Sequence, residues 1–506
     1  MALTSFGFLV FFAATLALYY LVPRRFRWWV LLAASQGFFA LAGGWQMLVL
    51  LWFGVAVTYA GARLVERADT DGKKRLIAGV TVALALLELV LLKYVPNVFS
   101  GAAGLFSLQI GGRALSLIVP LGISYYTLSI VGYVIDVYRG VCPAERNVLR
   151  HALFTAYYPQ VISGPVTRYG AMAPQLFGGA PFSYRNVTFG MERMLFGYFK
   201  KMVIADNLAL VVDHVFMNAD AFGGVFYLFA VVLYAVQIYC DFSGCMDIVL
   251  GASEAYGVVL PENFDAPFFS RTIPEFWRRW HITLGLWFKD YLLYPLLKSA
   301  PMQAVGAWSK RVFGKKRGKN VPTYLGLLLV WFCLGLWHGG TLKFLVASGL
   351  IPACYLILSS LFSPAIERAT KRLGIRTYCL SFRLFQYLRT FLLVCVIFLF
   401  VRADRCQTAL FMLRGMFAAS PVALGEGVSR MFSVFGGKTL AVLAYAVAVL
   451  AAVEIWHVKG VHVRERLARQ NLPARWAVLL VLLFSVLLFG AYGAAFNAAD
   501  FIYGGF

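Results

Sequence analysis

The chain has 506 residues, of which 61% are hydrophobic, and it carries a formal net charge of +23 at pH 7. Its mean hydropathy of +0.74 and its long, nearly charge-free stretches exclude an ordinary soluble enzyme and indicate a protein that crosses a membrane many times. Many basic residues lie in short connectors between apolar segments, as cytoplasmic retention requires, so we expect membrane lipids and not nucleic acid as their partners.

The apolar segments begin near the N-terminus and continue to the end of the chain. The first starts at Phe6 and ends before Pro23-Arg24-Arg25 without a small-residue cleavage pattern, so we expect a retained helix and not a removed signal peptide. Other clear segments include residues 80–92, 391–401, 440–453 and 476–490. Together they predict an all-α, polytopic membrane protein with roughly 11 to 13 membrane segments, some re-entrant or broken.

The eight cysteines are expected to be packing residues. There is no Cys-x-x-Cys pair and no Cys/His group with zinc-like spacing, so we expect neither a disulfide framework nor a metal site. No phosphate-binding glycine loop and no internal repeat is evident in the sequence.

The middle of the chain combines helix breakers with charges inside apolar runs. Gly164-Pro165 should interrupt a helix, which at membrane depth is tolerated only where the backbone is buried in protein or lines a cavity. Asp241 and Asp247 lie in an otherwise apolar run and should face the protein interior. We expect them to pack helices together and not to act as catalysts.

A first histidine, His281, follows a segment with a clear helix start. Thr272 or Ser270 can cap a helix whose first turn contains Pro274 and Glu275. Glu275 and Arg279 then face each other as i,i+4 partners, while Trp277, Trp280, His281 and Leu284 share one face. This mixture of tryptophans and arginines is typical of a bilayer interface, so we expect His281 at a water-accessible depth.

A second histidine, His338, ends the apolar stretch 330–337 and is followed by Gly339-Gly340, which let backbone or substrate approach closely. Desolvation there should favour the neutral ring, the form that acts as a general base. A histidine in or beside a bilayer is costly unless a reaction or a partner uses it. No serine or cysteine nucleophile is marked by its context, so a covalent acyl-enzyme is not favoured.

Several blocks resemble those of the membrane-bound O-acyltransferase (MBOAT) superfamily. Within it, the chain looks like the bacterial branch of alginate and peptidoglycan O-acetylase membrane subunits and the D-alanyl transfer protein of teichoic acid synthesis. The sequence motifs Asp-Val-Tyr-Arg-Gly and Pro-Glu-Asn-Phe favour the alginate-type O-acetylases over the D-alanyl transfer protein. The matching residues are 120–127, 136–140, Ser163-Gly164-Pro165 with Arg168, 237–244, 261–284, 337–339, 398–404 and 501–503, and the resemblance extends over nearly the whole chain.

The resemblance implies one MBOAT-like domain over residues 1–506, with tilted helices around a central funnel. Its parts would be N-terminal helices (1–115), a catalytic core (116–345) and C-terminal helices (346–506). It also implies that His338 is the catalytic histidine and His281 the second motif histidine. One departure weakens the match to a particular substrate: residues 348–352 contain no histidine where such proteins often have a Trp-Gly-x-x-His-Gly pattern.

The expected reaction moves an acyl group, in the first instance acetyl from acetyl-CoA, across the cell membrane of a bacterium toward hydroxyls of an extracytoplasmic glycan. A carrier-protein thioester is the other possible donor, and an SGNH-type acyltransferase outside the membrane is an expected partner. No bound cofactor is expected. Catalytic residues are His338 and His281, and candidates for binding donor or acceptor are Trp337, Gly339, Trp280, Arg279, Arg168, Asn263 and Asp290.

Two other functions remain open from the sequence. Transfer of D-alanine from a carrier-protein thioester to teichoic acid would use the same residues. A transporter or flippase would also have intramembrane acids and broken helices, but it would be expected to show repeat symmetry between its halves. The basic residues between positions 310 and 319 are expected to form a cytoplasmic loop near the donor entrance, where they can also attract an anionic donor.

Overall fold

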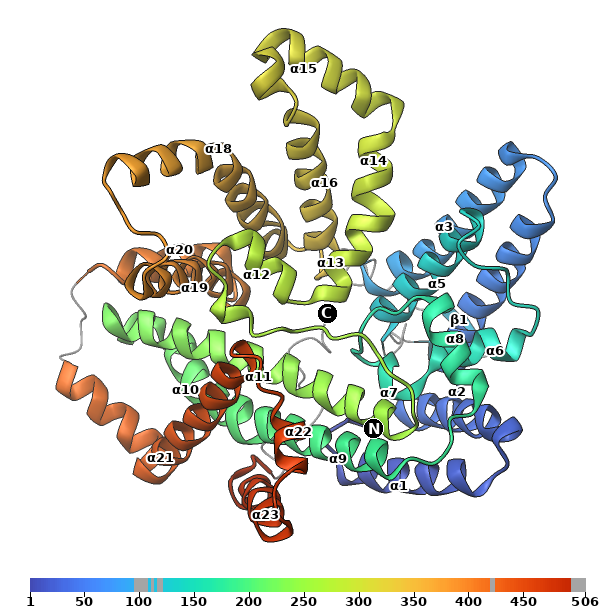
Figure 1. Cartoon of the computed structure of the whole chain (residues 1–506), viewed down its shortest axis with the longest axis horizontal. Helices are drawn as coiled ribbons and strands as arrows, with labels where there is room; N and C mark the ends of the chain where they lie inside the picture. Colours follow the sequence, from blue (N-terminus) through green and yellow to red (C-terminus); the bar gives the residue numbers. More distant parts are fainter. Residues whose placement is uncertain (95–107, 111–112, 116–121, 419–423, 493–506) are drawn as a thin grey trace. The chain divides into compact units, whose positions relative to one another are not determined.

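The computed structural model describes residues 1–94, 108–110, 113–115, 122–418 and 424–492 (Figure 1). Pro120, Leu121 and the closing motif at 501–503 lie outside the described residues. The chain divides into two compact units. Unit 1 comprises Met1–Tyr198, Gly244–Pro261 and Tyr492–Phe506, and unit 2 comprises Phe199–Ser243 and Glu262–Ala491. The prediction of a single domain with three parts stays a prediction.

The described part of unit 1 consists of helices and two short antiparallel strands, in which Gln109 pairs with Ala114. Ser5 caps the first helix and Thr70 the third, since each side chain accepts a hydrogen bond from the backbone N–H three residues later. The elements are α1 (Phe6–Leu21), η1 (Arg24–Phe26), α2 (Arg27–Arg67), α3 (Asp71–Lys93), β1 (Leu108–Ile110), β2 (Arg113–Leu115), α5 (Ile123–Tyr138), α6 (Val148–Ala156), α7 (Tyr158–Val161), α8 (Tyr169–Gly178), α9 (Tyr184–Tyr198) and the second part of α11 (Val225–Ala255).

The helix break expected at Gly164-Pro165 is confirmed. Helix α7 ends at Val161 and α8 begins at Tyr169, with non-helical backbone between them. A Cβ at Gly164 would lie 2.6 Å from the backbone oxygen of Gln160, so the turn is too tight for any larger residue. Asp247, on α11, pairs with Arg193 of α9 at 2.9 Å, in keeping with the packing role expected for it.

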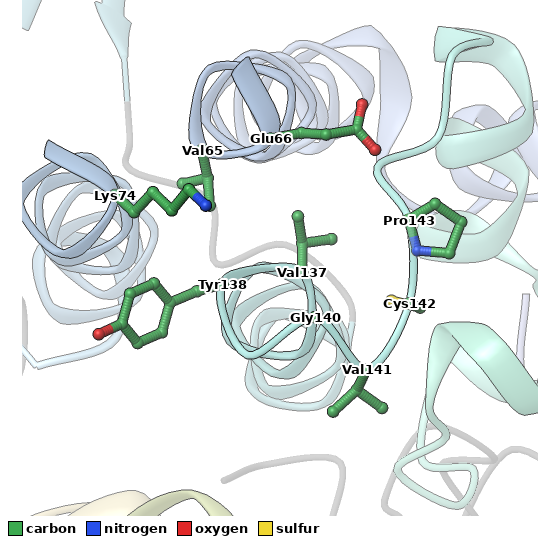
Figure 2. Close-up of a pocket in the computed structure, with 9 residues that line it drawn as sticks. All are labelled: Val65, Glu66, Lys74, Val137, Tyr138, Gly140, Val141, Cys142 and Pro143. Carbon is green, nitrogen blue, oxygen red and sulfur yellow. The ribbon is translucent and has the colours of Figure 1, made fainter. Parts of the chain in front are cut away.

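Unit 1 also contains a cavity of about 390 Å³ where α2 and α5 end and α3 begins. Figure 2 shows Glu66 and Lys74 on its wall, with Cys142 on the segment that follows α5. The backbone N–H of Ala144 donates to Glu66 Oε1 at 3.0 Å, so the carboxylate fixes that segment to the end of α2. Neither candidate histidine is among the residues that line this cavity.

Unit 2 contains both candidate histidines. It includes three π-helices, at Phe199–Ala205, Lys289–Leu293 and Leu345–Leu350, an unusual helix type that is frequent at functional sites. Its elements are η3 (Phe199–Ala205), α10 (Asp206–Met217), η4 (Ala219–Ala221), the first part of α11, η5 (Pro267–Phe269), α12 (Ile273–Arg279), α13 (Ile282–Phe288), η6 (Lys289–Leu293), α14 (Tyr294–Lys298), α15 (Ala300–Gly318), α16 (Val321–Trp337), α17 (Leu342–Phe344), η7 (Leu345–Leu350), α18 (Ile351–Arg372), α19 (Leu380–Arg402), α20 (Cys406–Gly415), α21 (Leu424–Val458), α22 (Val463–Ala468) and α23 (Leu472–Phe489).

Seven helices of the described chain are long and apolar enough to cross a membrane, or up to eight if α15 and α16, bent by 95° at their junction, form one span. This is fewer than the expected 11 to 13, because some apolar segments are too short to count. Helix α1, for example, has only 16 residues, and an α-helix needs about 20 to cross the hydrocarbon core. The chain is a multi-pass membrane protein.

The basic segment 310–319 is helical, so the expectation of a loop is wrong. Helix α15 continues to Gly318 through a kink at Gly314, whose φ of +75° only glycine adopts readily. The hydroxyl of Ser309 donates to the backbone oxygen of Gly318 at 2.8 Å and holds the two sides of the kink together. The six basic side chains remain exposed, as a charged patch requires: Lys310, Arg311, Lys315, Lys316, Arg317 and Lys319.

Candidate active site

The segment before His281 begins as the sequence predicts. Thr272 caps α12, since its hydroxyl oxygen accepts a hydrogen bond from the backbone N–H of Glu275 at 3.2 Å. Glu275 and Arg279 form the expected i,i+4 ion pair at 3.0 Å. Arg279 also donates to the backbone oxygen of Asp265 at 3.4 Å, so its guanidinium braces the preceding turn.

The helix then ends earlier than the sequence indicates. Trp280 is extended and forms an isolated bridge with Phe264, so the expected continuous face of Trp277, Trp280, His281 and Leu284 is wrong. The backbone N–H of Ile282 donates to the oxygen of Asn263 at 3.0 Å, which draws the chain away from a helical path. Helix α13 starts only after His281.

His281 itself adopts a left-handed backbone conformation, with φ 48° and ψ 52°. Only one other described non-glycine residue, Ala266, has positive φ. Such a conformation is unfavourable by about 1–3 kcal/mol for a residue with a side chain, and it persists where the surroundings enforce it. It turns the imidazole out of the helical repeat and toward the interior.

Asn263 fixes the orientation of this imidazole. Its Oδ1 accepts hydrogen bonds from Thr283, from the backbone N–H at 3.1 Å and from the hydroxyl at 3.0 Å, and lies 3.2 Å from Nδ1 of His281. A backbone N–H can only donate, so the atom of Asn263 at this position must be the oxygen. His281 therefore donates from Nδ1, and its Nε2 carries the lone pair when the ring is neutral.

His281 is buried, which corrects the expectation of a water-accessible position. Only 5% of the residue is exposed, and Nε2 is also inaccessible to solvent. The ring of Phe242 meets the imidazole edge to face at a centroid distance of 4.8 Å. Burial, followed by the proximity of His338, lowers the pKa of His281 well below its usual value of 6.5, so the ring is neutral near pH 7.

His338 caps the C-terminal end of α16 and is half-buried. The centroid of its ring lies 4.9 Å from that of Trp337, which also faces the imidazole of His281 at a centroid distance of 6.1 Å. The two histidine motifs, well separated in sequence, thus meet at one tryptophan. After His338 the chain turns through Gly339 and Gly340, with φ of +142° and +70°. A Cβ at Gly339 would lie 3.0 Å from the ring of Phe344, so glycine is needed there.

The other predicted site residues have different positions. Trp337 and Trp280 are 5% and 3% exposed, and Trp280 packs on Phe264 and Phe276 as part of the wall behind His281. Asp290 is half-buried on the π-helix η6, and contact between Asp290 or Arg279 and a substrate stays a prediction. Arg168 belongs to unit 1, where it is exposed and precedes α8, and its role also stays a prediction.

Comparison with known proteins gives the family. A sequence profile described as "MBOAT, membrane-bound O-acyltransferase family" matches residues 145–307. The probable alginate O-acetylase of Pseudomonas syringae pv. tomato is 34% identical over 454 residues, which are 87% of this chain and 79% of that protein. The chain belongs to the membrane-bound O-acyltransferase family.

Two further relatives of this acyltransferase differ in how much of the chain they match. The peptidoglycan O-acetyltransferase of Helicobacter pylori is 29% identical over 446 residues, covering 83% of this chain and 78% of that protein. The teichoic acid D-alanyltransferase of Bacillus subtilis is 28% identical over 232 residues, covering 44% of this chain and 55% of that protein. Family membership identifies the chain as an acyltransferase and not as a transporter.

Sequence reasoning missed the residue of this acyltransferase that contacts His281 from α11 and the lysines of η3 that bind α11 beside it. Phe242 contacts the imidazole, and Lys200 and Lys201 are both buried on the π-helix before α10. Asp241 is buried as expected and pairs with Lys201 at 2.6 Å. The sequence did contain a signal for this pairing, namely two adjacent lysines within an apolar stretch. Buried charges are retained only where partners compensate them.

Proposed function

We propose that this acyltransferase moves an acetyl group from acetyl-CoA toward hydroxyls of a polysaccharide outside the cytoplasmic membrane of a bacterium. The observation that carries the proposal is the 34% identity to a probable alginate O-acetylase over 87% of the chain, together with the paired histidines. The match to a teichoic acid D-alanyltransferase covers only 44% of the chain, which makes D-alanyl transfer the weaker alternative.

In this mechanism a ring nitrogen of His338 takes the proton from the acceptor hydroxyl. The oxygen attacks the carbonyl carbon of the thioester, and the tetrahedral intermediate collapses as the carbon–sulfur bond breaks. The CoA thiolate then takes the proton from the imidazolium, which leaves an acetyl ester, free CoA and a neutral histidine. His338 suits this role because it is only half-buried, so a substrate can reach it.

His281 has a positioning role in the proposed reaction. Asn263 holds its Nδ1–H, so the lone pair on Nε2 keeps a fixed direction inside the buried site. Burial keeps the ring neutral and prevents it from competing with His338 for the reacting proton. The aromatic wall of Trp280 and Trp337 excludes water, which limits hydrolysis of the thioester.

The transfer itself can be tested in cells and in membranes. We expect deletion of the gene to remove O-acetyl groups from the secreted polysaccharide and wild-type protein to restore them, measured by base-labile acetate. Membranes that contain the protein and an envelope fraction with an SGNH-type partner should move radiolabel from acetyl-CoA to glycan. Transfer from a D-alanyl carrier-protein thioester, with none from acetyl-CoA, would instead establish the alternative donor.

The basic patch of α15 is expected to raise the rate at which an anionic donor associates. Replacing Lys315, Lys316 and Arg317 by glutamine should raise KM for acetyl-CoA, most at low ionic strength, and leave kcat nearly unchanged, because salt screens clustered charge. Donor kinetics at two salt concentrations measure this. The control removes three exposed charges from the end of α18, at Arg368, Lys371 and Arg372. Equal KM values in wild type and the α15 variant would leave the patch only a topological role.

A further inference from the structure

The π-helix η3 carries two adjacent buried lysines in unit 2. Lys200 and Lys201 are 4% and 6% exposed. Lysine is almost never this buried unless a partner compensates the charge, and π-helical turns are frequent at functional sites. Neither lysine has a role in the acyl-transfer steps proposed above.

Each lysine binds one residue of α11, and the two bound residues flank one phenylalanine. Nζ of Lys201 lies 2.6 Å from Oδ1 of Asp241, and Nζ of Lys200 donates to the hydroxyl oxygen of Ser243 at 2.9 Å. The residue between these two anchors is Phe242, which is fully buried. The π-helix therefore fixes the rotation of α11 about its axis at the position of Phe242.

Phe242 is in direct contact with His281. Its ring meets the imidazole at 89° and 4.8 Å, and meets the ring of Phe264 at 81° and 5.0 Å. Asn263 holds one edge of the imidazole, and Phe242 packs against the ring. If α11 rotated, this contact would be lost and the imidazole would gain room to leave its position.

We propose that the ion pair of Lys201 and Asp241 is a positioning device for the histidine site, holding Phe242 of α11 against His281 so that the imidazole stays fixed. Lys201 and Asp241 are thus positioning residues that do not touch the substrate. The kinetic part of this proposal rests on the proposed acetyl transfer, whereas the orientation of His281 can be measured without any turnover.

The chain provides two matched controls. Asp206 also contacts Lys201, at 2.7 Å, but it belongs to α10 and not to α11. Arg193 and Asp247 form a second ion pair that involves α11, at 2.9 Å, within unit 1. Neutralising Asp206, or the pair of Arg193 and Asp247, removes comparable charges without removing an anchor of Phe242.

The experiment compares Lys201→Met, Asp241→Asn, their double variant, Asp206→Asn and the double variant Arg193→Met/Asp247→Asn, all in the full-length protein in lipid nanodiscs. The first readout is the rate at which diethyl pyrocarbonate modifies His281, followed by mass spectrometry of its peptide. The second is kcat and KM for acetyl transfer. Melting temperatures report the stability of every variant.

We expect Lys201→Met and Asp241→Asn to speed modification of His281 about tenfold and to lower kcat about 10- to 100-fold, with KM within about twofold, since small misplacement near the chemistry has effects of this size. The double variant of Lys201 and Asp241 should change both readouts about as much as the single variants do, because it too lacks the contact that anchors α11 beside Phe242. Asp206→Asn and the variant of Arg193 and Asp247 should leave the modification rate within about twofold of wild type.

The proposal is overturned if Lys201→Met lowers the melting temperature but leaves both the modification rate of His281 and kcat unchanged. It is also overturned if the controls speed modification as much as Lys201→Met does. Absence of acetyl transfer in wild type would refute the proposed donor or acceptor instead, and the modification rates would still decide the role of the ion pair.

Discussion

Purified His338→Ala protein is expected to transfer acyl groups about 10²–10⁴-fold more slowly than wild type, which is the loss typical when a general base is removed. The protein should remain folded and inserted, because the side chain is half-buried and the helix-ending hydrogen bond from its backbone N–H to Leu334, at 3.0 Å, does not need the imidazole. Turnover with saturating donor and acceptor, at matched amounts of inserted protein, measures the effect.

A suitable control for this variant is His462→Ala, which removes an exposed imidazole that precedes α22. It should leave turnover within about twofold of wild type, as expected of a surface substitution away from special features. Near-normal turnover of His338→Ala at a normal melting temperature would show that another group takes the hydroxyl proton, and His281, with its lone pair on Nε2, would be the next candidate.

Features determined by neighbours in sequence were predictable. The start of α12 depends on Thr272 and on the N–H of Glu275, and the ion pair of Glu275 with Arg279 spans one turn. The helix break at Gly164-Pro165 follows from the missing N–H and fixed φ of proline. Membrane segments were predictable for the same reason, since hydropathy is summed over one continuous stretch.

The position of His281 was not predictable, because distant residues determine it. Asn263 holds the imidazole from 18 residues earlier in the chain, and Phe242 and Trp337 come from other helices. The helical pattern alone placed His281 on the wet face of one longer helix. The structure instead makes His281 the more buried of the two histidines, and His338 the more accessible.

The partners of the buried charged residues also could not be predicted from the sequence. Asp241 was correctly expected to face the interior, but nothing in its own segment identifies Lys201 as its partner. The connection depends on the π-helical turn of η3, which directs two adjacent lysines to two residues of α11. The kink of α15 at Gly314 was missed because a run of basic residues is equally consistent with a loop.

The variant Asn263→Asp is expected to shift the pH dependence of the enzyme. Aspartate keeps an oxygen that accepts from Nδ1 of His281 and from Thr283, so the fold should persist. Its carboxylate, however, favours the imidazolium and opposes the effect of burial, so the pKa of His281 should rise, by about 1–3 units for an opposite charge this close.

The sign of the change in rate follows from the form of the ring that is active. In the proposed mechanism His281 must be neutral, because an imidazolium there would place a positive charge near His338 and weaken that base. A raised pKa keeps His281 protonated up to a higher pH. The acid limb of the profile of kcat against pH should therefore shift to higher pH. The largest loss of activity is expected below neutral pH, with partial recovery in alkaline buffer.

The matched control is Thr283→Val, which removes one hydroxyl donor to the same oxygen without adding a charge. It should lower stability by about 0.5–1.5 kcal/mol, the net loss of one hydrogen bond whose acceptor keeps two other donors, while its acid limb coincides with that of wild type. Profiles of kcat against pH for the three proteins decide the matter. If folded Asn263→Asp protein has the wild-type profile, the ionisation of His281 has no influence on acyl transfer, and its neutral, oriented ring is not required in the way the mechanism assumes.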